Sequence, residues 1–361
     1  MNSPLPPTFA PDSPYRRLAS SLDGLPNRFP AAQDGSDLRL LAWLFTPEQA
    51  DLAAALLPTL ETPAQISQRL GRDLHDTATL LKEMSQEGLI ATGKTGQGRL
   101  GFGLLPFVVG IYENQNERMD AQLARLFEDY FLQAFGRALE IKPQVHRVIP
   151  VRESIPNTME IQPFDSVSNL IDRSQAWGVL DCICRKQKAL IGQACKHPVD
   201  VCLVFADTPD AFAGSSTIRP LTRQGAYQTL QRAAQAGLVH CVSNNQNNVW
   251  YICNCCTCSC GVLRGMVDLG IANVVAHSPF VNRVDEDLCT GCGECLDSCQ
   301  FNALSVDGVA RVQEMRCAGC GICIQFCQQG ALHLEHRPGE SIPPASEEDW
   351  QAARRATLQV K

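Results

Sequence analysis

The sequence predicts an α+β protein of several domains, and three observations lead to that prediction. Residues 37–112 combine helical periodicity with a Gly-rich hairpin pattern. Residues 165–280 mix helical and strand patterns and contain ten of the 18 cysteines. Two runs of regularly spaced cysteines follow within residues 281–338. The remaining parts are a flexible N-terminal segment at 1–36, a helix and connector at 113–164, and a C-terminal tail at 339–361.

Composition excludes a membrane span and favours metal chemistry. The longest apolar runs, LLAWLF and LLPFVVGIY, are too short to cross a bilayer. The opening MNSPLPPTFAPDSPYRRL has no apolar core of a signal peptide, so we expect a cytoplasmic protein. Because the cytoplasm keeps thiols reduced, 18 cysteines indicate metal or cluster binding rather than a disulfide framework.

The N-terminal module reads as three helices followed by a hairpin. The helical stretches are PEQADLAAALL, TPAQISQRLG and LHDTATLLKEMSQEGL, and the hairpin is LIATGKTGQGRLGFG. This order resembles a winged-helix module, in which residues 74–87 take the place of the recognition helix. Residues 37–105 contain six basic and eight acidic side chains and no basic stripe, so DNA is not the expected partner. A role in protein docking or dimerisation fits this balance better.

The string GLIATGKT at residues 88–95 matches a phosphate-binding loop by its letters. Such a loop needs a strand before it and a helix after it, whereas here a helix precedes it and a Gly-rich stretch follows. We therefore reject a nucleotide site. The helix expected within residues 117–140 has an apolar face suited to packing or to a homodimer contact, and both alternatives stay open.

The C-terminal cysteine runs carry the most specific signal. Residues 289–299 read CTGCGECLDSC and residues 317–327 read CAGCGICIQFC, so each is C-x-x-C-x-x-C-x-x-x-C. The segment resembles the bacterial-type ferredoxin with two [4Fe-4S] clusters. That resemblance implies one cluster on Cys289, Cys292, Cys295 and Cys327, and a second on Cys317, Cys320, Cys323 and Cys299.

Two further features belong to this segment. The family usually has Pro after the fourth cysteine of each run, whereas this chain has Gln300 and Gln328. The stretch ALSVDGVARV predicts a hairpin that turns at Asp307 and Gly308. The small core is expected to use Phe301, Leu304, Ile322, Phe326 and Leu332.

The central cysteines predict at least one further metal centre. Side chains two residues apart in an extended segment share a face, so Cys182 pairs with Cys184 and Cys253 pairs with Cys255. The rest of the stretch ICNCCTCSC would then point the other way, which divides its thiols between two sites. The candidate ligands are Cys182, Cys184, Cys195, Cys202, Cys253, Cys255, Cys256, Cys258 and Cys260.

An iron-sulfur cluster is expected here in preference to zinc, because neither half of the domain has paired C-x-x-C spacing. Cys182, Cys195, Cys202, Cys253 and Cys255 are the preferred ligands. Basic residues near them, among them Arg185, Lys186, Lys188 and Lys196, either favour thiolates or form a solvated loop. His197 is a candidate nitrogen ligand, but a His before Pro in a loop more often has a structural role.

The motifs C-x-C-R, C-x-H-P and I-C-N-C-C, between a winged helix and a ferredoxin, resemble a group of iron-sulfur proteins from anaerobic microbes. The resemblance implies architecture and cluster chemistry but no substrate. In this chain Ser259 interrupts the denser cysteine pattern expected of that group.

We expect an electron-transfer protein that works with a redox protein partner. One alternative is a redox-sensing transcription regulator. Another is an oxidoreductase with the central cysteines as its catalytic centre. No residue is assigned a catalytic role, because no flavin or nicotinamide fingerprint is present. An electron carrier or oxidoreductase subunit fits better than a stand-alone enzyme.

Overall fold

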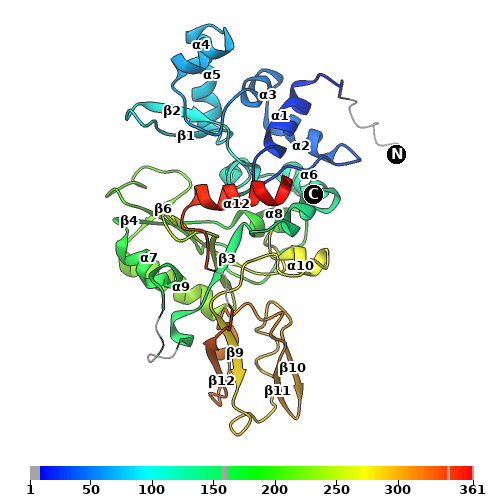
Figure 1. Ribbon diagram of the computed structural model, residues 1–361, viewed down its shortest axis with the longest axis vertical. Helices are drawn as coiled ribbons and strands as arrows, with labels where there is room; N and C mark the ends of the chain where they lie inside the picture. The colour runs from blue at the N-terminus through cyan, green and yellow to red at the C-terminus, as the bar shows by residue number, and fades with distance from the viewer. Residues whose placement is uncertain (1–8, 156–158, 160, 340–341, 360–361) are drawn as a thin grey trace. The chain divides into compact units, whose positions relative to one another are not determined.

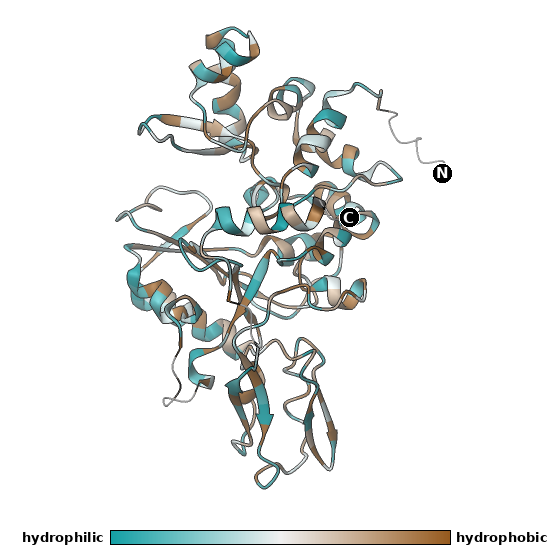
Figure 2. Cartoon of the chain, viewed as in Figure 1, coloured by the Kyte–Doolittle hydropathy of each residue, from teal (hydrophilic) through white to brown (hydrophobic). Residues whose placement is uncertain are grey.

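The computed structural model (Figure 1) describes residues 9–155, 159, 161–339 and 342–359. The chain is a mixed α/β protein that divides into two compact units, Met1–Ala138 and Leu139–Lys361. In the described residues, no helix is long and apolar enough to cross a membrane. In Figure 2 teal and brown residues alternate along the helices, as expected for amphipathic helices that bury one face.

The first unit consists mainly of helices with one two-stranded sheet. Each of four helices has a side-chain cap at its N-terminus, provided by Ser13, Thr46, Thr62 and Asp73. The elements are α1 (Pro14–Asp23), α2 (Ser36–Leu44), α3 (Pro47–Ala54), α4 (Pro63–Leu70), α5 (Leu74–Gln86), β1 (Ala91–Lys94), β2 (Leu100–Gly103), the short turns η1 (Phe107–Ile111) and η2 (Glu113–Gln115), α6 (Ala121–Gln133) and η3 (Phe135–Glu140).

Helix α1 lies inside the segment that the sequence predicted to be flexible. Pro14 occupies the first turn after the Ser13 cap, and Leu18 and Leu22 are buried where α1 packs on α3. The prediction of a flexible segment over all of 1–36 is therefore wrong for α1. The abundance of Pro and Ser in this region hid a short capped helix with an apolar face.

Helices α4 and α5 lead into the β1–β2 hairpin, as the sequence predicted. The hairpin is antiparallel, and an isolated bridge joins Glu61 to Phe102 of β2. Lys94, the lysine of GLIATGKT, is the last residue of β1, and a turn rather than a helix follows it. The geometry therefore lacks the helix N-terminus that a phosphate loop requires.

Helix α6 packs against α2 and completes an aromatic core. Phe127, Tyr130 and Phe131 of α6 are buried, and the rings of Phe127 and Tyr112 stack with their centroids 3.9 Å apart. The apolar face predicted for residues 117–140 is thus used for packing within this unit. The helix itself is shorter than expected and ends at Gln133.

The second unit is built on a six-stranded antiparallel sheet with the strand order β3-β7-β8-β5-β4-β6. Helices α7 and α9 pack on one face, over a core that includes Ile171, Leu203, Phe205, Leu230 and Ile252. The elements are β3 (His146–Ile149), the short turns η4 (Arg152–Ser154) and η5 (Pro163–Asp165), α7 (Val167–Arg173), β4 (Ala176–Leu180), α8 (Ile183–Leu190), β5 (Cys202–Ala206), β6 (Arg219–Leu221), α9 (Arg223–Gln235), β7 (Val239–Ser243), β8 (Tyr251–Cys255) and α10 (Arg264–Asp268).

The C-terminal part of this unit contains two small antiparallel sheets, each of two strands, with strand β11 of one contacting β9 of the other. The predicted hairpin is present, and Gly308 at its tip has a φ of 71°. Phe301 and Ile322 are buried as expected, but Phe326 is exposed, so its assignment to the core is wrong. The elements are β9 (Phe280–Val284), β10 (Leu304–Asp307), β11 (Val309–Val312), α11 (Ile322–Gln325) and β12 (Leu332–His336).

The predicted C-terminal tail contains helix α12 (Glu347–Gln359). Trp350 and Arg354 of α12 are buried: the indole N–H donates to the Gln144 carbonyl at 2.8 Å, and Arg354 donates to the carbonyls of Ile141 and Pro143. The predicted tail therefore contains a docked helix. The helix is polar apart from a few anchoring side chains, and its sequence pattern gave little indication that it would dock.

Candidate metal centres

The C-terminal cysteines gather into two groups of four. Cys289, Cys292, Cys295 and Cys327 line one pocket. The second group consists of Cys299, Cys317, Cys320 and Cys323. Burial raises the pKa of Cys323 above that of a free thiol, and the negative charges of the other three members raise it further. Each group takes three thiols from one cysteine run and the fourth from the other run.

Backbone and side-chain N–H groups point at these sulfurs. The Ala310 amide donates to Cys289 Sγ at 3.3 Å, and the Ala303 amide donates to Cys299 Sγ at 3.3 Å. Asn282 donates twice, from its amide to Cys317 at 3.5 Å and from Nδ2 to Cys323 at 3.4 Å. Such donors stabilise negative sulfur, which is what a thiolate-bound cluster presents.

One glycine in each cysteine run lets the backbone close around the thiols. Gly291 and Gly319 have φ values of 69° and 68°, in the left-handed region. A Cβ on Gly291 would lie 2.2 Å from the Gly308 carbonyl oxygen, and one on Gly319 would lie 2.1 Å from that of Phe280. With the N–H donors and the four thiols of each group, these loops have the chemistry that [4Fe-4S] binding requires.

Residues 288–340 match the 4Fe-4S dicluster domain family. The C-terminal segment is ferredoxin-like. We call residues 288–340 the dicluster domain, and the chain is accordingly an iron-sulfur protein. No curated protein matches the chain.

Strand alternation separates the central cysteines into two groups. Ile252 of β8, Leu203 of β5 and Val242 of β7 face the helix-covered core. Their neighbours therefore face the other side of the sheet, because side chains alternate along a strand. The cysteines placed on this opposite face are Cys202, Cys241, Cys253 and Cys255.

Cys256 does not belong with the cysteines on this opposite face. Its side chain packs with Val201, Ala233 and Leu238. The sequence argument that adjacent Cys255 and Cys256 serve different sites therefore agrees with where the two thiols lie. Cys260 differs from the prediction, because it joins Cys255 rather than Cys256 and Cys258.

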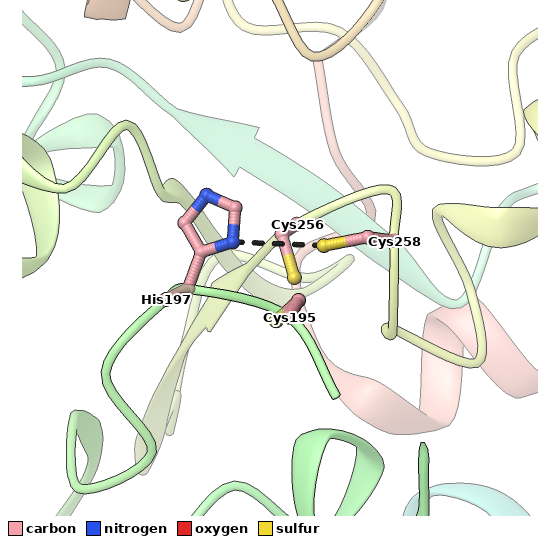
Figure 3. A group of neighbouring side chains, drawn as sticks. All are labelled: Cys195, His197, Cys256 and Cys258. Atoms are coloured by element: carbon pink, nitrogen blue, oxygen red, sulfur yellow. Dashed lines mark hydrogen bonds between the residues drawn. The ribbon is translucent and has the colours of Figure 1, made fainter. Parts of the chain in front are cut away.

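The first central group, which we call the Cys₃His group, consists of Cys195, His197, Cys256 and Cys258 (Figure 3). Its four ligand atoms all lie within 4.8 Å of one another, and Cys258 Sγ lies 3.5 Å from His197 Nδ1. Tetrahedral zinc bonds of about 2.0–2.3 Å place ligand atoms roughly 3.6–3.8 Å apart. The group thus has nearly the dimensions of a site for a single ion.

Charge at the Cys₃His group favours a thiolate. Contact with the Cys258 thiol, together with His197 and the buried Arg185, lowers the pKa of Cys256 to about 3. Ser259, which interrupts the cysteine pattern, is buried and donates its hydroxyl to Cys195 Sγ at 3.4 Å. His197 was weighed in the sequence as a structural residue, and the geometry now places it among the candidate ligands. The C-x-H and C-x-C spacings were the available signal.

The second central group, which we call the six-thiol ring, lies on the opposite face of the sheet. Cys182 precedes α8 and Cys184 lies within it, so these two meet at a helix N-terminus and not on an extended segment as predicted. The members of the ring are Cys182, Cys184, Cys202, Cys253, Cys255 and Cys260.

Gln300 connects the dicluster domain to the ICNCCTCSC stretch. Its Oε1 accepts hydrogen bonds from the amide and the hydroxyl of Thr257, both at 3.0 Å, and its Nε2 donates to the Gly237 carbonyl at 3.1 Å. This is one of the two positions where the ferredoxin family usually has Pro. Proline could make none of these bonds, so the substitution has a structural consequence here.

We predict that Gln300→Ala loosens the contact between Thr257 and the dicluster domain. Losing three hydrogen bonds, each worth about 0.5–1.5 kcal/mol, should destabilise the unit by roughly 1.5–4.5 kcal/mol. Hydrogen exchange should speed up at residues 256–260. The matched control is Gln328→Ala at the equivalent position of the second run, where the side chain is exposed. Equal exchange in both variants would contradict the prediction.

Proposed function

We propose that the chain is an electron-transfer protein with two [4Fe-4S] clusters in the dicluster domain and a further metal centre among the central cysteines. One cluster is held by Cys289, Cys292, Cys295 and Cys327, and the other by Cys317, Cys320, Cys323 and Cys299. The observation that carries the proposal is the gathering of these eight thiols into two groups of four within a matched dicluster domain. When bound, such clusters supply one-electron redox chemistry.

The protein's own residues set the conditions for that chemistry. N–H donors to Cys289, Cys299, Cys317 and Cys323 stabilise the reduced, more negative state. The first group reaches the surface, because Cys292 is exposed. The second group is more enclosed, with Cys317 and Cys323 buried. Electrons would therefore enter or leave most directly through the first group.

The surface around the first group suits a redox partner with a basic face. Residues 284–335 contain eight acidic and two basic side chains, a net charge of −6. Leu288 and Leu296 are exposed beside this charge. Opposite charge steers association and apolar contact then holds the partners together.

An oxidoreductase with a central catalytic centre is the second candidate, and one observation favours it. A groove of about 340 Å³ is lined by His197 of the Cys₃His group and by Ser298 and Gln300 of the dicluster domain. Ser298 and Gln300 are the sequence neighbours of Cys299. Lys196 and Asp297 also line it, as does the exposed Phe326. A small molecule in this groove would lie beside both a candidate metal ion and the second thiol group.

We further propose that residues 37–112 form a winged-helix-like docking module. Three of its arginines are already ion-paired: Arg39 with Asp34, Arg69 with Glu61 and Arg72 with Asp51. The exposed side chains of α5 include Asp76 and Glu83 as well as Lys82. Phosphate binding needs unpaired cations, so this surface favours a protein partner over DNA.

We predict that Cys292→Ala removes about four irons from the anaerobically purified chain. After reduction, the EPR spectrum should change from two magnetically interacting clusters to one. The control is Cys241→Ala, which replaces a buried thiol outside both groups and should keep the spectrum. A colourless, zinc-loaded wild-type protein would contradict the proposal.

We also predict that the full chain binds duplex DNA only weakly at low salt, where non-specific electrostatic attraction is strongest. Fluorescence anisotropy with a labelled duplex should show no saturation at micromolar protein. Micromolar or tighter binding that weakens steeply as salt is raised would instead support the alternative of a redox-sensing transcription regulator.

A further inference from the structure

We propose that the six-thiol ring binds a polynuclear iron-sulfur centre that is separate from a single metal ion at the Cys₃His group. This inference rests on the proposed function, because it assumes a cell that supplies clusters to this chain. It adds a third cluster site and assigns the central cysteines to two different centres.

The ring is closed by contacts between neighbouring thiols. Each thiol interacts with the next, in the order Cys182, Cys184, Cys260, Cys255, Cys253, Cys202 and back to Cys182. The pairing of Leu203 with Ile252 places Cys202 of β5 opposite Cys253 of β8. The six thiols come from the start of α8, the start of β5, strand β8 and the turn that follows β8. Three separate stretches of the chain, residues 182–184, 202 and 253–260, therefore converge on one place.

The ring is too open and has too many ligands for a single ion. In the described part of the chain, the Cys₃His group is the set whose ligand atoms all lie within 4.8 Å of one another, and no three ring thiols meet that limit. A tetrahedral ion uses four ligands at close range. Six thiols around an open centre suit several irons that share inorganic sulfide, because soft thiolate ligands select such clusters.

Arg185 provides an independent indication that an anion binds here. Its side chain is only 3% exposed, and Nη1 donates to the Asn254 carbonyl at 3.0 Å and lies 3.7 Å from Cys256 Sγ. Nε and Nη2 are buried and have no hydrogen-bond partner among the described residues. The guanidinium interacts electrostatically with Cys182 and Cys202 of the ring.

A buried cation with two unused donors is costly unless an anion meets it. A thiolate-bound iron-sulfur centre carries net negative charge and exposes sulfide acceptors, so it would satisfy Nε and Nη2. The sequence left open whether Arg185 favours thiolates or belongs to a solvated loop. The structure buries it near the central thiols.

The ring lies next to the dicluster domain. Cys241 of β7 is the cross-strand partner of Cys253 of the ring, and the negative charge of the Cys320 thiolate acts on Cys241. The Cys320 carbonyl accepts a hydrogen bond from the Val151 amide at 2.9 Å, just after β3, the strand that pairs with β7. A centre in the ring would thus lie close to the second thiol group of the dicluster domain.

The test is a count of iron, inorganic sulfide and zinc in the full chain after anaerobic purification, with EPR of the reduced protein. We expect clearly more than the roughly eight irons of two [4Fe-4S] clusters. The double variant Cys202→Ala/Cys253→Ala should lose the surplus iron and sulfide but keep the dicluster spectrum. The matched control Cys258→Ala, in the Cys₃His group, should lose one metal ion and no sulfide.

Three results would overturn the inference. If the dicluster spectrum is intact, about eight irons in the wild type would show that the ring holds no cluster. Loss of the surplus iron in Cys258→Ala would show that the six-thiol ring and the Cys₃His group form one centre. A wild type without a dicluster spectrum would remove the proposed function, and the ring cluster with it.

A variant that keeps every thiol guards against misfolding as an explanation. Arg185→Met removes the buried charge and preserves volume. Because a nearby positive charge favours the reduced state, the midpoint potential of the third cluster should fall while those of the dicluster domain stay unchanged. An unchanged third potential would overturn the placement of Arg185 against the ring.

Discussion

The arrangement of the central cysteines depends on the alternation of side chains along strand β8. Ile252 faces the core under α7 and α9, so Cys253 and Cys255 must face the opposite side of the sheet. Cys256 then turns back to pack with Val201 and Leu238. This alternation keeps the six-thiol ring and the Cys₃His group apart. Arg185 donates toward Cys256 of the Cys₃His group and interacts electrostatically with Cys182 and Cys202 of the ring.

Those parts of the site that depend on spacing could be predicted from the sequence. The two cysteine runs defined a ferredoxin-like segment, and the family match covers it at residues 288–340. Period-two reasoning placed Cys253 with Cys255 and divided the ICNCCTCSC stretch between two sides. The ferredoxin-like segment is confirmed, whereas the division of the ICNCCTCSC stretch was wrong for Cys260, which joins Cys255. Local geometry that a few neighbouring residues determine is what the sequence could predict.

Features that depend on distant contacts could not be predicted in this way. His197 becomes a candidate ligand only because its loop meets the turn that carries Cys258, 61 residues later. The sequence showed that Gln300 departs from the family's usual Pro, but not that its side chain hydrogen-bonds with Thr257 and Gly237. Helix α12 docks through Trp350 and Arg354 onto backbone more than 200 residues away, at separations that no local pattern encodes.

Native mass spectrometry of the whole, anaerobically purified chain tests the central claim most directly, because it weighs every bound centre in one measurement. The account predicts a mass above that of the bare chain by two [4Fe-4S] clusters, a third iron-sulfur centre and one further metal ion. On mild oxidation these additions should be lost in separate steps. A bare chain, or one that carries only zinc, would contradict the account.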